Sequence, residues 1–366
     1  MFPGRAQEPD RAVREILFVE LLGGLGDVLI SLGAVQALAR SHAEARLTVL
    51  TFPPGGELLQ GDPFIHEVIH VERPDPTHPR RAREAVEEML ARRKWDLAVS
   101  DTCYDDIDEV ISSSGVPRTV TNLWRTPPSE ARVGERFLRI LLAEGLVMPD
   151  AVCPPQLHPH SGERSAATRK LAGIRRPLAF LLPDAGMEVK RWPEESWGAL
   201  GRALVERYGA GLVVPVGSAP EQASRVAELA GEEALVWPRG TLRKLAAALS
   251  HADLAVGADT GPARIAAALG VPTVTLFGPS WHGRYGQPPP HGNLQGHPGC
   301  TQRVVSDFTR QPCWYEGVCT LGEAPWRSCL EDIPVEGVLQ ASASCLESRS
   351  AGKTVPDTTI TQGGAL

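Results

Sequence analysis

The chain has 366 residues, of which 42% are hydrophobic and 22% are charged, a composition typical of a globular protein with about two domains. Its formal net charge of −7 argues against nucleic acid or an anionic membrane surface as the main partner. No apolar run is long enough to span a membrane, and residues 1–14 lack the apolar core of a signal peptide. We therefore expect a cytoplasmic protein without stable membrane association.

The first half of the chain alternates between short apolar runs and segments with helical spacing. After a flexible arm (1–14), this alternation predicts a Rossmann-like domain with a parallel sheet over residues 15–165. The expected strands are residues 16–19, 47–52, 67–71 and 95–100. The expected helices are residues 27–40, 79–93 and 130–144.

A stretch rich in Pro, His and Ser (151–170) has no periodicity and is expected to link two domains. The alternation then restarts and predicts a second Rossmann-like domain over residues 166–330. Its expected strands are residues 177–182, 211–216, 235–237, 254–256 and 273–277, and its expected helices are residues 193–208, 220–230, 242–250 and 262–269. A last helix within residues 331–348 is expected to pack back on the first domain, before a disordered tail (349–366).

The most informative stretch of the first half is Ile16–Leu32, which reads as a strand, a glycine turn and a helix. Such a turn brings bare backbone, here at Gly24 and Gly26, to the edge where α/β folds bind ligands. Asp27 stands at the start of the helix, where a carboxylate is stabilised as an anion, so it is a candidate general base. A dinucleotide fingerprint is not favoured, because Leu29 occupies the third glycine position.

In the second half, Gly257–Pro262 lies between an expected strand and an expected helix. Asp259 or Thr260 can cap that helix, and the free amides near Gly261 form an anion site suited to a diphosphate. Arg264, one turn into the helix, adds a positive charge. Lys190, which follows Gly186 and the preceding strand, is expected to face the same anion.

Two further loops complete a predicted nucleotide-diphosphate pocket. Glu221, which opens a helix, could accept hydrogen bonds from a ribose diol or merely complement the helix dipole. Gly240 leaves room for a base to approach the backbone. All these loops follow the carboxyl ends of expected parallel strands, so we expect them to meet at one edge of the sheet.

These residues occur in motifs that resemble the family-nine glycosyltransferases, the ADP-heptose heptosyltransferases of the GT-B fold. The resemblance covers about Ile16 to Cys345. In the first half it rests on LLGGLGDVLISLGAVQAL, GDPFIHEVI and WDLAVSD. In the second half it rests on KRWPEESW, VVPVGSAPEQA, DTGPARIAAALGVPTVTLFGPS and the spacing PC-x5-C-x9-CL. The resemblance implies two Rossmann-like domains that face each other across a central cleft.

The resemblance also implies an inverting glycosyl transfer that needs no metal and no cofactor, with a nucleotide-diphosphate sugar, ADP-sugar favoured, as co-substrate. Asp27 is then the general base, Lys190 and the Thr260-Gly261 amides bind the donor diphosphate, and Glu221 binds the donor ribose. This chain departs from the family at three points, all bearing on the donor sugar rather than on the chemistry. They are Arg264 in place of the usual His, Ala185-Gly186 before the lysine, and Arg310 or Gln311 in place of a cysteine.

The acceptor is harder to predict. The acidic residues Asp101, Asp105, Asp106, Asp108 and Glu109 follow an expected strand, where they could attract a polycation. This favours a small, soluble, cationic acceptor such as an antibiotic intermediate, whereas a solvated helix start would explain the acidic segment without any acceptor. The chain could also be a lipopolysaccharide-core heptosyltransferase, an epimerase, or a nucleotide-sugar-binding protein without transfer activity. The oligomeric state is left open.

Two possible metal sites are not favoured. Asp106-Ile107-Asp108 resembles the D-x-D motif of other glycosyltransferases, but an exposed helix is the simpler interpretation. Cys300, Cys313, Cys319 and Cys329 could bind zinc, yet their spacing matches no common site, so packing or a disulfide is favoured.

Overall fold

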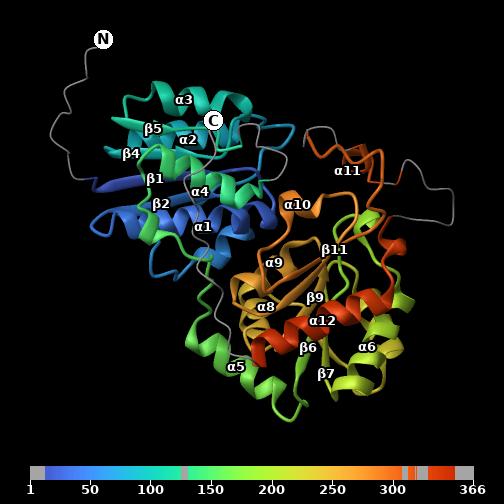
Figure 1. Ribbon diagram of the computed structural model, residues 1–366. Coiled ribbons are helices and arrows are strands. Elements are labelled where there is room, and N and C mark those ends of the chain that lie inside the picture. Colours follow the sequence, from blue (N-terminus) through green and yellow to red (C-terminus); the bar gives the residue numbers. More distant parts are fainter. Residues whose placement is uncertain (1–12, 125–130, 307–311, 318, 320–328, 351–366) are drawn as a thin grey trace. The chain divides into compact units, whose positions relative to one another are not determined.

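The computed structural model describes residues 13–124, 131–306, 312–317, 319 and 329–350 (Figure 1). These residues form two compact units, the first built mainly from residues 13–158 and the second mainly from residues 159–350. No helix in these ranges is long and apolar enough to cross a membrane.

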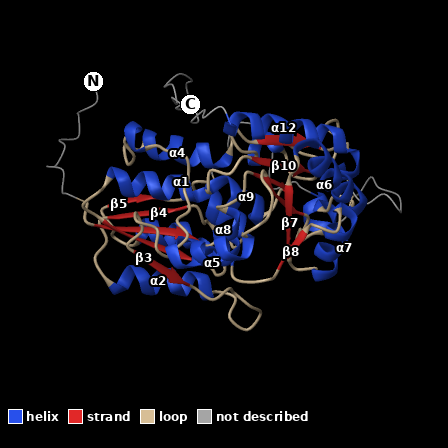
Figure 2. Cartoon of the chain, turned by 90° about the horizontal axis from the view of Figure 1, so that it is seen from below, coloured by secondary structure: helices blue, strands red, loops and turns tan. Residues whose placement is uncertain are grey.

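The first unit is a five-stranded parallel sheet in the order β3-β2-β1-β4-β5. Its strands are β1 (Glu15–Glu20), β2 (Arg46–Thr51), β3 (Glu67–His70), β4 (Leu97–Ser100) and β5 (Arg118–Val120). Its helices are α1 (Leu25–Ser41), α2 (Arg81–Arg92), α3 (Ile107–Ser113) and α4 (Val133–Ala143). Because strand side chains alternate, Leu17 and Val19 pack toward α2 and α3. Helices α1 and α4 cover the opposite face (Figure 2).

The second unit is a six-stranded parallel sheet in the order β11-β10-β9-β6-β7-β8. Its strands are β6 (Leu178–Leu182), β7 (Gly211–Pro215), β8 (Leu235–Trp237), β9 (Leu254–Ala258), β10 (Thr273–Phe277) and β11 (Gly292–Gln295). Its helices are α5 (Ser161–Leu171), α6 (Glu194–Tyr208), α7 (Pro220–Ala230), α8 (Leu242–Leu249), α9 (Gly261–Ala268), α10 (His282–Tyr285), α11 (Pro312–Glu316) and α12 (Val335–Ser350). Helices α6, α7 and α12 share one hydrophobic core with the sheet, while α5, α8 and α9 lie together on the other side (Figure 2).

The expected fold class, an α/β protein with two Rossmann-like parallel sheets, is confirmed. The sequence analysis missed the edge strands β5 and β11, which are short and contain polar residues or glycine. The helix that it favoured for the Asp106-Ile107-Asp108 segment forms as α3. Residues 161–171 form helix α5, although most of this segment belongs to the expected linker (151–170), whose sequence shows no periodicity. Helix α5 forms there because Glu163 accepts a hydrogen bond from the His160 amide, 3.0 Å away, and pairs with Arg243 of α8 at 2.9 Å.

The last helix packs within the second unit, whereas we expected it to pack on the first. Val338 and Leu339 of α12 are buried in the same hydrophobic core as β9 and β10. Helix α12 also continues to Ser350, past residue 348, where we expected the helical segment to end. The expected arm (1–14) and tail (349–366) fall mostly outside the described residues.

In both units, the strand that comes first in the chain, β1 or β6, is an inner strand of its sheet. The chain runs outward from β1 to β2 and β3 and then returns to β4 on the other side of β1. In the second unit it runs from β6 to β7 and β8 and returns to β9. The loops after β1 and β4, and those after β6 and β9, therefore diverge at a topological switch point, where open α/β sheets bind their ligands.

Candidate functional site

The candidate base lies at the switch point of the first unit. Asp27 is in the first turn of α1, and its Oδ2 atom accepts a hydrogen bond from the Gly24 amide at 2.9 Å. The preceding turn needs a glycine at position 23, because its φ of +102° lies in the left-handed region. Asp27 is partly exposed. The turn therefore holds one carboxylate at the helix N-terminus, with access to solvent.

The structure corrects the placement of Asp101. We expected this residue among the acidic groups at the edge of the domain, but its side chain is 0% exposed. Its Oδ1 atom accepts a hydrogen bond from Thr102 at 3.0 Å, and burial together with the nearby Glu20 raises its pKa well above the ordinary value. Asp101 follows the fully buried strand β4 directly, and it continues into the interior. The expectation that it contacts an acceptor in solution is therefore wrong.

Two other acidic residues remain at the surface, but they are paired. Asp106 lies 3.2 Å from Arg83 of α2, and Asp105 lies 3.9 Å from Arg80. Both aspartates have positive φ angles, 54° for Asp105 and 56° for Asp106, a strained backbone of the kind that often occurs at functional loops. Their pairing with arginines weakens the argument for a cationic acceptor. An acceptor role for Asp105 and Asp106 stays a prediction.

In the second unit, two tryptophans position the candidate donor-binding lysine. Trp192 and Trp197 are buried and pack edge to face, with 5.0 Å between ring centroids. The indole nitrogen of Trp192 also donates a hydrogen bond to the Ile333 carbonyl at 3.1 Å. This packing anchors the end of the loop that follows β6, and Lys190, two residues before Trp192, is only 8% exposed.

Asp259, directly after β9, joins the two candidate cations. Its Oδ2 atom lies 3.6 Å from Nζ of Lys190, and its Oδ1 atom accepts a hydrogen bond from Arg264 at 2.9 Å. Ser280, after β10, donates a third contact at 2.5 Å. Burial alone would raise the pKa of Asp259, but the two cations and the Ser280 hydroxyl outweigh burial and hold this pKa below its usual value. The three side chains of Lys190, Arg264 and Asp259 together carry one net positive charge.

Helix α9 begins next to this cluster with its first amides available. Thr260 is the N-cap residue, and its side chain makes no capping hydrogen bond. Of the two capping residues that we considered, Thr260 therefore holds the position and Asp259 does not. Within the described residues, the amides of Gly261 and Ala263 have no hydrogen-bond acceptor. A helix N-terminus with free amides beside a net positive charge is suited to bind a phosphate group.

Glu221 and Gly240 follow β7 and β8 at the same edge of the sheet, but the structure does not bring them into the Asp259 cluster. Glu221 is exposed and lines a separate cavity of about 590 Å³ with Arg191 and Trp192. Gly240 is exposed, and a Cβ atom there would come no closer than 3.4 Å to Lys244. Their roles in binding a ribose and a base stay predictions.

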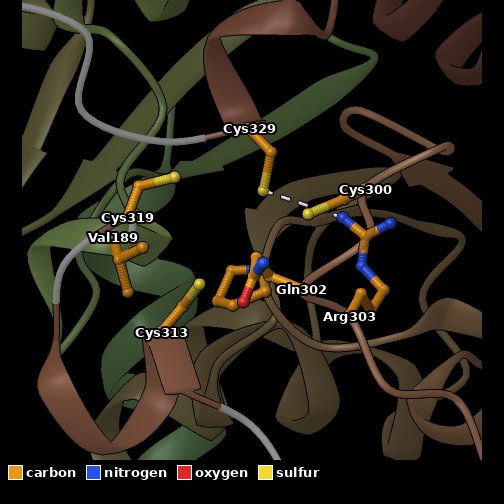
Figure 3. A pocket seen from close by; sticks show the side chains of 8 residues that line it. Val189, Cys300, Gln302, Arg303, Cys313, Cys319 and Cys329 are labelled. Atoms are coloured by element: carbon orange, nitrogen blue, oxygen red, sulfur yellow. Dashed lines mark hydrogen bonds between the residues drawn. The ribbon is translucent and has the colours of Figure 1, made fainter. Parts of the chain in front are cut away.

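Four cysteines surround a small cavity of about 10 Å³ in the second unit, near Val189 and Arg303 (Figure 3). They are Cys300, Cys313, Cys319 and Cys329, and all four are free thiols. Burial raises the pKa of the Cys329 thiol to about 11, even though Arg303 donates a hydrogen bond to it at 3.7 Å. Within the described residues, no group of His, Cys, Asp or Glu could hold a metal ion. The interpretation of these cysteines as packing residues stays a prediction.

Sequence reasoning missed several residues that shape the site. Ser280 lies in the run TVTLFGPS that carried the family resemblance, and its place after a strand could have revealed it. Glu20 ends β1 with a charged side chain after four apolar residues, which was a visible irregularity. The contacts of Arg73 and Tyr104 with the glycine turn had no sequence signal, because both residues come from distant loops.

Comparisons with known proteins match the chain to one family. The model of glycosyltransferase family 9 (heptosyltransferase) matches residues 130–313. Lipopolysaccharide heptosyltransferase 1 of Pseudomonas aeruginosa is 41% identical over 317 residues, which cover 79% of this chain and 83% of that relative.

Solved structures show the same fold. A family 9 glycosyltransferase from Veillonella parvula aligns with a TM-score of 0.75 at 20% identity, covering 94% of this chain and 100% of that one. The ADP-heptose lps heptosyltransferase II of Escherichia coli aligns with a TM-score of 0.66 at 19% identity, covering 92% and 99%.

Proposed function

This chain belongs to glycosyltransferase family 9, and we propose that it transfers a heptose from ADP-heptose to a hydroxyl group of the lipopolysaccharide core. The acceptor is inferred from the 41% identity to a lipopolysaccharide heptosyltransferase, over 83% of that relative's length. The donor is inferred from the name of the E. coli structure of the same fold. An antibiotic intermediate as acceptor has no support from these relatives, so the lipopolysaccharide core replaces it.

In the proposed reaction, the acceptor hydroxyl oxygen attacks the anomeric carbon of the heptose. The bond from that carbon to the diphosphate oxygen breaks, and ADP leaves with the bonding electrons. The hydroxyl proton passes to Asp27, whose carboxylate is held by the Gly24 amide and has access to solvent. The direct displacement inverts the configuration at the anomeric carbon.

One observation carries the proposed donor site: buried Lys190 and partly buried Arg264 both contact Asp259, just before α9. The net positive charge and the free amides of Gly261 and Ala263 would stabilise the charge that develops on the departing diphosphate. Glu221 and Gly240, farther along the same sheet edge, are proposed to contact the ribose and the base.

Replacing Asp27 by Asn tests the base. We expect kcat to fall at least about 100-fold, the lower range for general base catalysis, while ADP binding stays within about twofold. The matched control is Asp96→Asn, because Asp96 also accepts hydrogen bonds from backbone amides, those of Arg14 and Glu15, but at the opposite end of β1. Turnover by Asp27→Asn equal to that of the control would contradict the assignment.

The acceptor is tested by offering ADP-heptose with a heptose-deficient lipopolysaccharide core, with an aminoglycoside, or with no acceptor. Transfer to the core alone is the expected result. Transfer only to the aminoglycoside would reinstate the cationic acceptor. Donor epimerisation without an acceptor would identify an epimerase, and ADP-heptose binding without any product would identify a binding protein.

A further inference from the structure

The first unit contains two buried carboxyl groups that the proposed transfer does not use. Glu20 ends β1 and is 1% exposed, and Asp101 follows β4 and is 0% exposed. The strands β1 and β4 are neighbours, with Val19 opposite Ser100, so the next residues, Glu20 and Asp101, lie side by side. Both lie at the switch point from which α1 carries Asp27.

No positive charge compensates this pair within the part of the chain that the structure describes. There, neither Glu20 nor Asp101 has a cationic side chain within ion-pairing distance, and the Oδ2 atom of Asp101 is buried without a hydrogen-bond partner. An ionised carboxylate in such a place is strongly disfavoured. A protonated carboxyl group avoids this cost, because it is neutral.

The surroundings favour the neutral form of both groups. Burial, together with the negative charge of Asp27, raises the pKa of Glu20 to about 7, although a hydrogen bond from Thr51 lowers it. Burial and Glu20 raise the pKa of Asp101 still more clearly. Among the described residues, Cys103 and Tyr104 interact electrostatically with the pair, while Asp108 acts on Cys103 and Asp105 and Arg73 act on Tyr104. Arg73 is exposed and donates to the Gly23 carbonyl, not to either carboxyl group.

The same side chains hold the turn that presents the base. The Leu21 amide donates to Thr102, which itself donates to Asp101, at 2.8 and 3.0 Å. The Leu22 amide donates to Glu20 at 3.3 Å. On the other side of the turn, Tyr104 donates to the Leu21 carbonyl at 2.8 Å. A change in the charge of Glu20 therefore acts directly on the backbone that leads to Asp27, and a change in the charge of Asp101 acts on it through Thr102.

We propose that Glu20 and Asp101 are positioning residues that are protonated in mildly acidic solution, hold the Leu21–Gly24 turn, and leave the negative charge of the three carboxyl groups on Asp27, with Glu20 the first of the pair to lose its proton as the pH rises. This inference rests on the proposed role of Asp27 as general base. Environments that separate the protonation states of neighbouring carboxyl groups allow one of them to act as a base while the others stay neutral.

The first test does not depend on activity. Infrared difference spectra of the full-length protein at pH 6, recorded as wild type minus Glu20→Gln and wild type minus Asp101→Asn, should each show the carbonyl band of a protonated carboxyl group. Raising the pH through about 7 should remove the Glu20 band first. The absence of both bands at pH 6 would overturn the proposal, even if heptosyl transfer proceeds. A protein with both bands but no heptosyl transfer would contradict only the proposed function.

The second test is the dependence of kcat on pH. We expect the wild-type kcat to fall as the pH rises through about 7, because ionised Glu20 repels Asp27 and disturbs the turn. In Glu20→Gln this fall should disappear, while kcat at pH 6 stays within about threefold of the wild type. The matched control is Tyr104→Phe, which removes another hydrogen bond to the turn but leaves both carboxyl groups: kcat should drop and the fall near pH 7 should remain. An unchanged pH profile in Glu20→Gln would refute the positioning role.

Discussion

The Nζ atom of Lys190 lies 3.6 Å from Oδ2 of Asp259, although 69 residues separate them in the sequence. The contact exists because β6 and β9 are neighbours in the sheet, so the loops that follow them meet at one edge. Asp259 also pairs with Arg264, which lies in the helix α9 that follows Asp259 in the chain. This carboxylate therefore orients both cations of the proposed donor site.

Replacing Arg264 by Ala should weaken ADP binding at least tenfold, which corresponds to about 1.4 kcal/mol. The Arg264 side chain is 13% exposed and provides one of the two positive charges beside Asp259, so its loss leaves Lys190 balanced by Asp259. Isothermal titration with ADP measures the change. Arg207→Ala is the control, since Arg207 forms an exposed pair with Glu336 in the same unit. An unchanged Kd for Arg264→Ala would place this side chain outside the ADP site.

Replacing Asp259 by Asn should destabilise the second unit by roughly 3 kcal/mol at pH 7, because two buried cations lose their partner. The pKa of Asp259 is lowered in the folded protein, so its stabilising contribution is present above the ordinary pKa and is lost as the pH falls through the folded value. Denaturant unfolding should therefore give a constant difference from the wild type between about pH 5 and 8, and a smaller one below about pH 4. A difference that changes between pH 5 and 8 would contradict this assignment.

Compared with the wild type, the Glu20→Gln variant should be more stable at pH 8 than it is at pH 5. The pKa of Glu20 rises from 4.5 to about 7 on folding, so the wild type loses stability as the pH rises through this range, by roughly 3 kcal/mol for a difference of this size. Glutamine does not titrate and avoids the loss. Melting temperatures at both pH values measure the effect. Tyr104→Phe keeps Glu20, so its difference from the wild type should be the same at both pH values. If the melting temperature of Glu20→Gln differs from that of the wild type by the same amount at pH 5 and pH 8, Glu20 is already ionised at pH 5.

Replacing Asp105 and Asp106 together by Asn separates the two kinds of acceptor. The change releases Arg80 and Arg83 from their ion pairs and makes this surface more positive. For an anionic lipopolysaccharide core, the acceptor KM should fall at low salt and the effect should fade at high salt. A rise in KM would favour the cationic acceptor instead. Because the pairs are near the surface, stability should change by less than about 1 kcal/mol.

Local signals in the sequence were sufficient for most elements and for the candidate base. The strand at 273–277 and the helix at 220–230 could be predicted because their apolar patterns depend only on residues that are close in the sequence. The structure forms both segments with these bounds. Asp27 was predictable because a glycine turn and the helix after it are contiguous in the chain. The family resemblance rested on the same short motifs.

Only the tertiary structure decided which distant groups meet. The acidic residues after β4 look alike in the sequence, yet Asp101 is buried beside Glu20 while Asp106 pairs with Arg83 at the surface. Likewise, the sequence indicated that Lys190 and Arg264 face an anion, but not that Asp259 holds both of them. The physical reason is that burial and ion pairing depend on strand order and helix packing across the whole unit. Those long-range contacts set the charge of each group, and residue type alone does not.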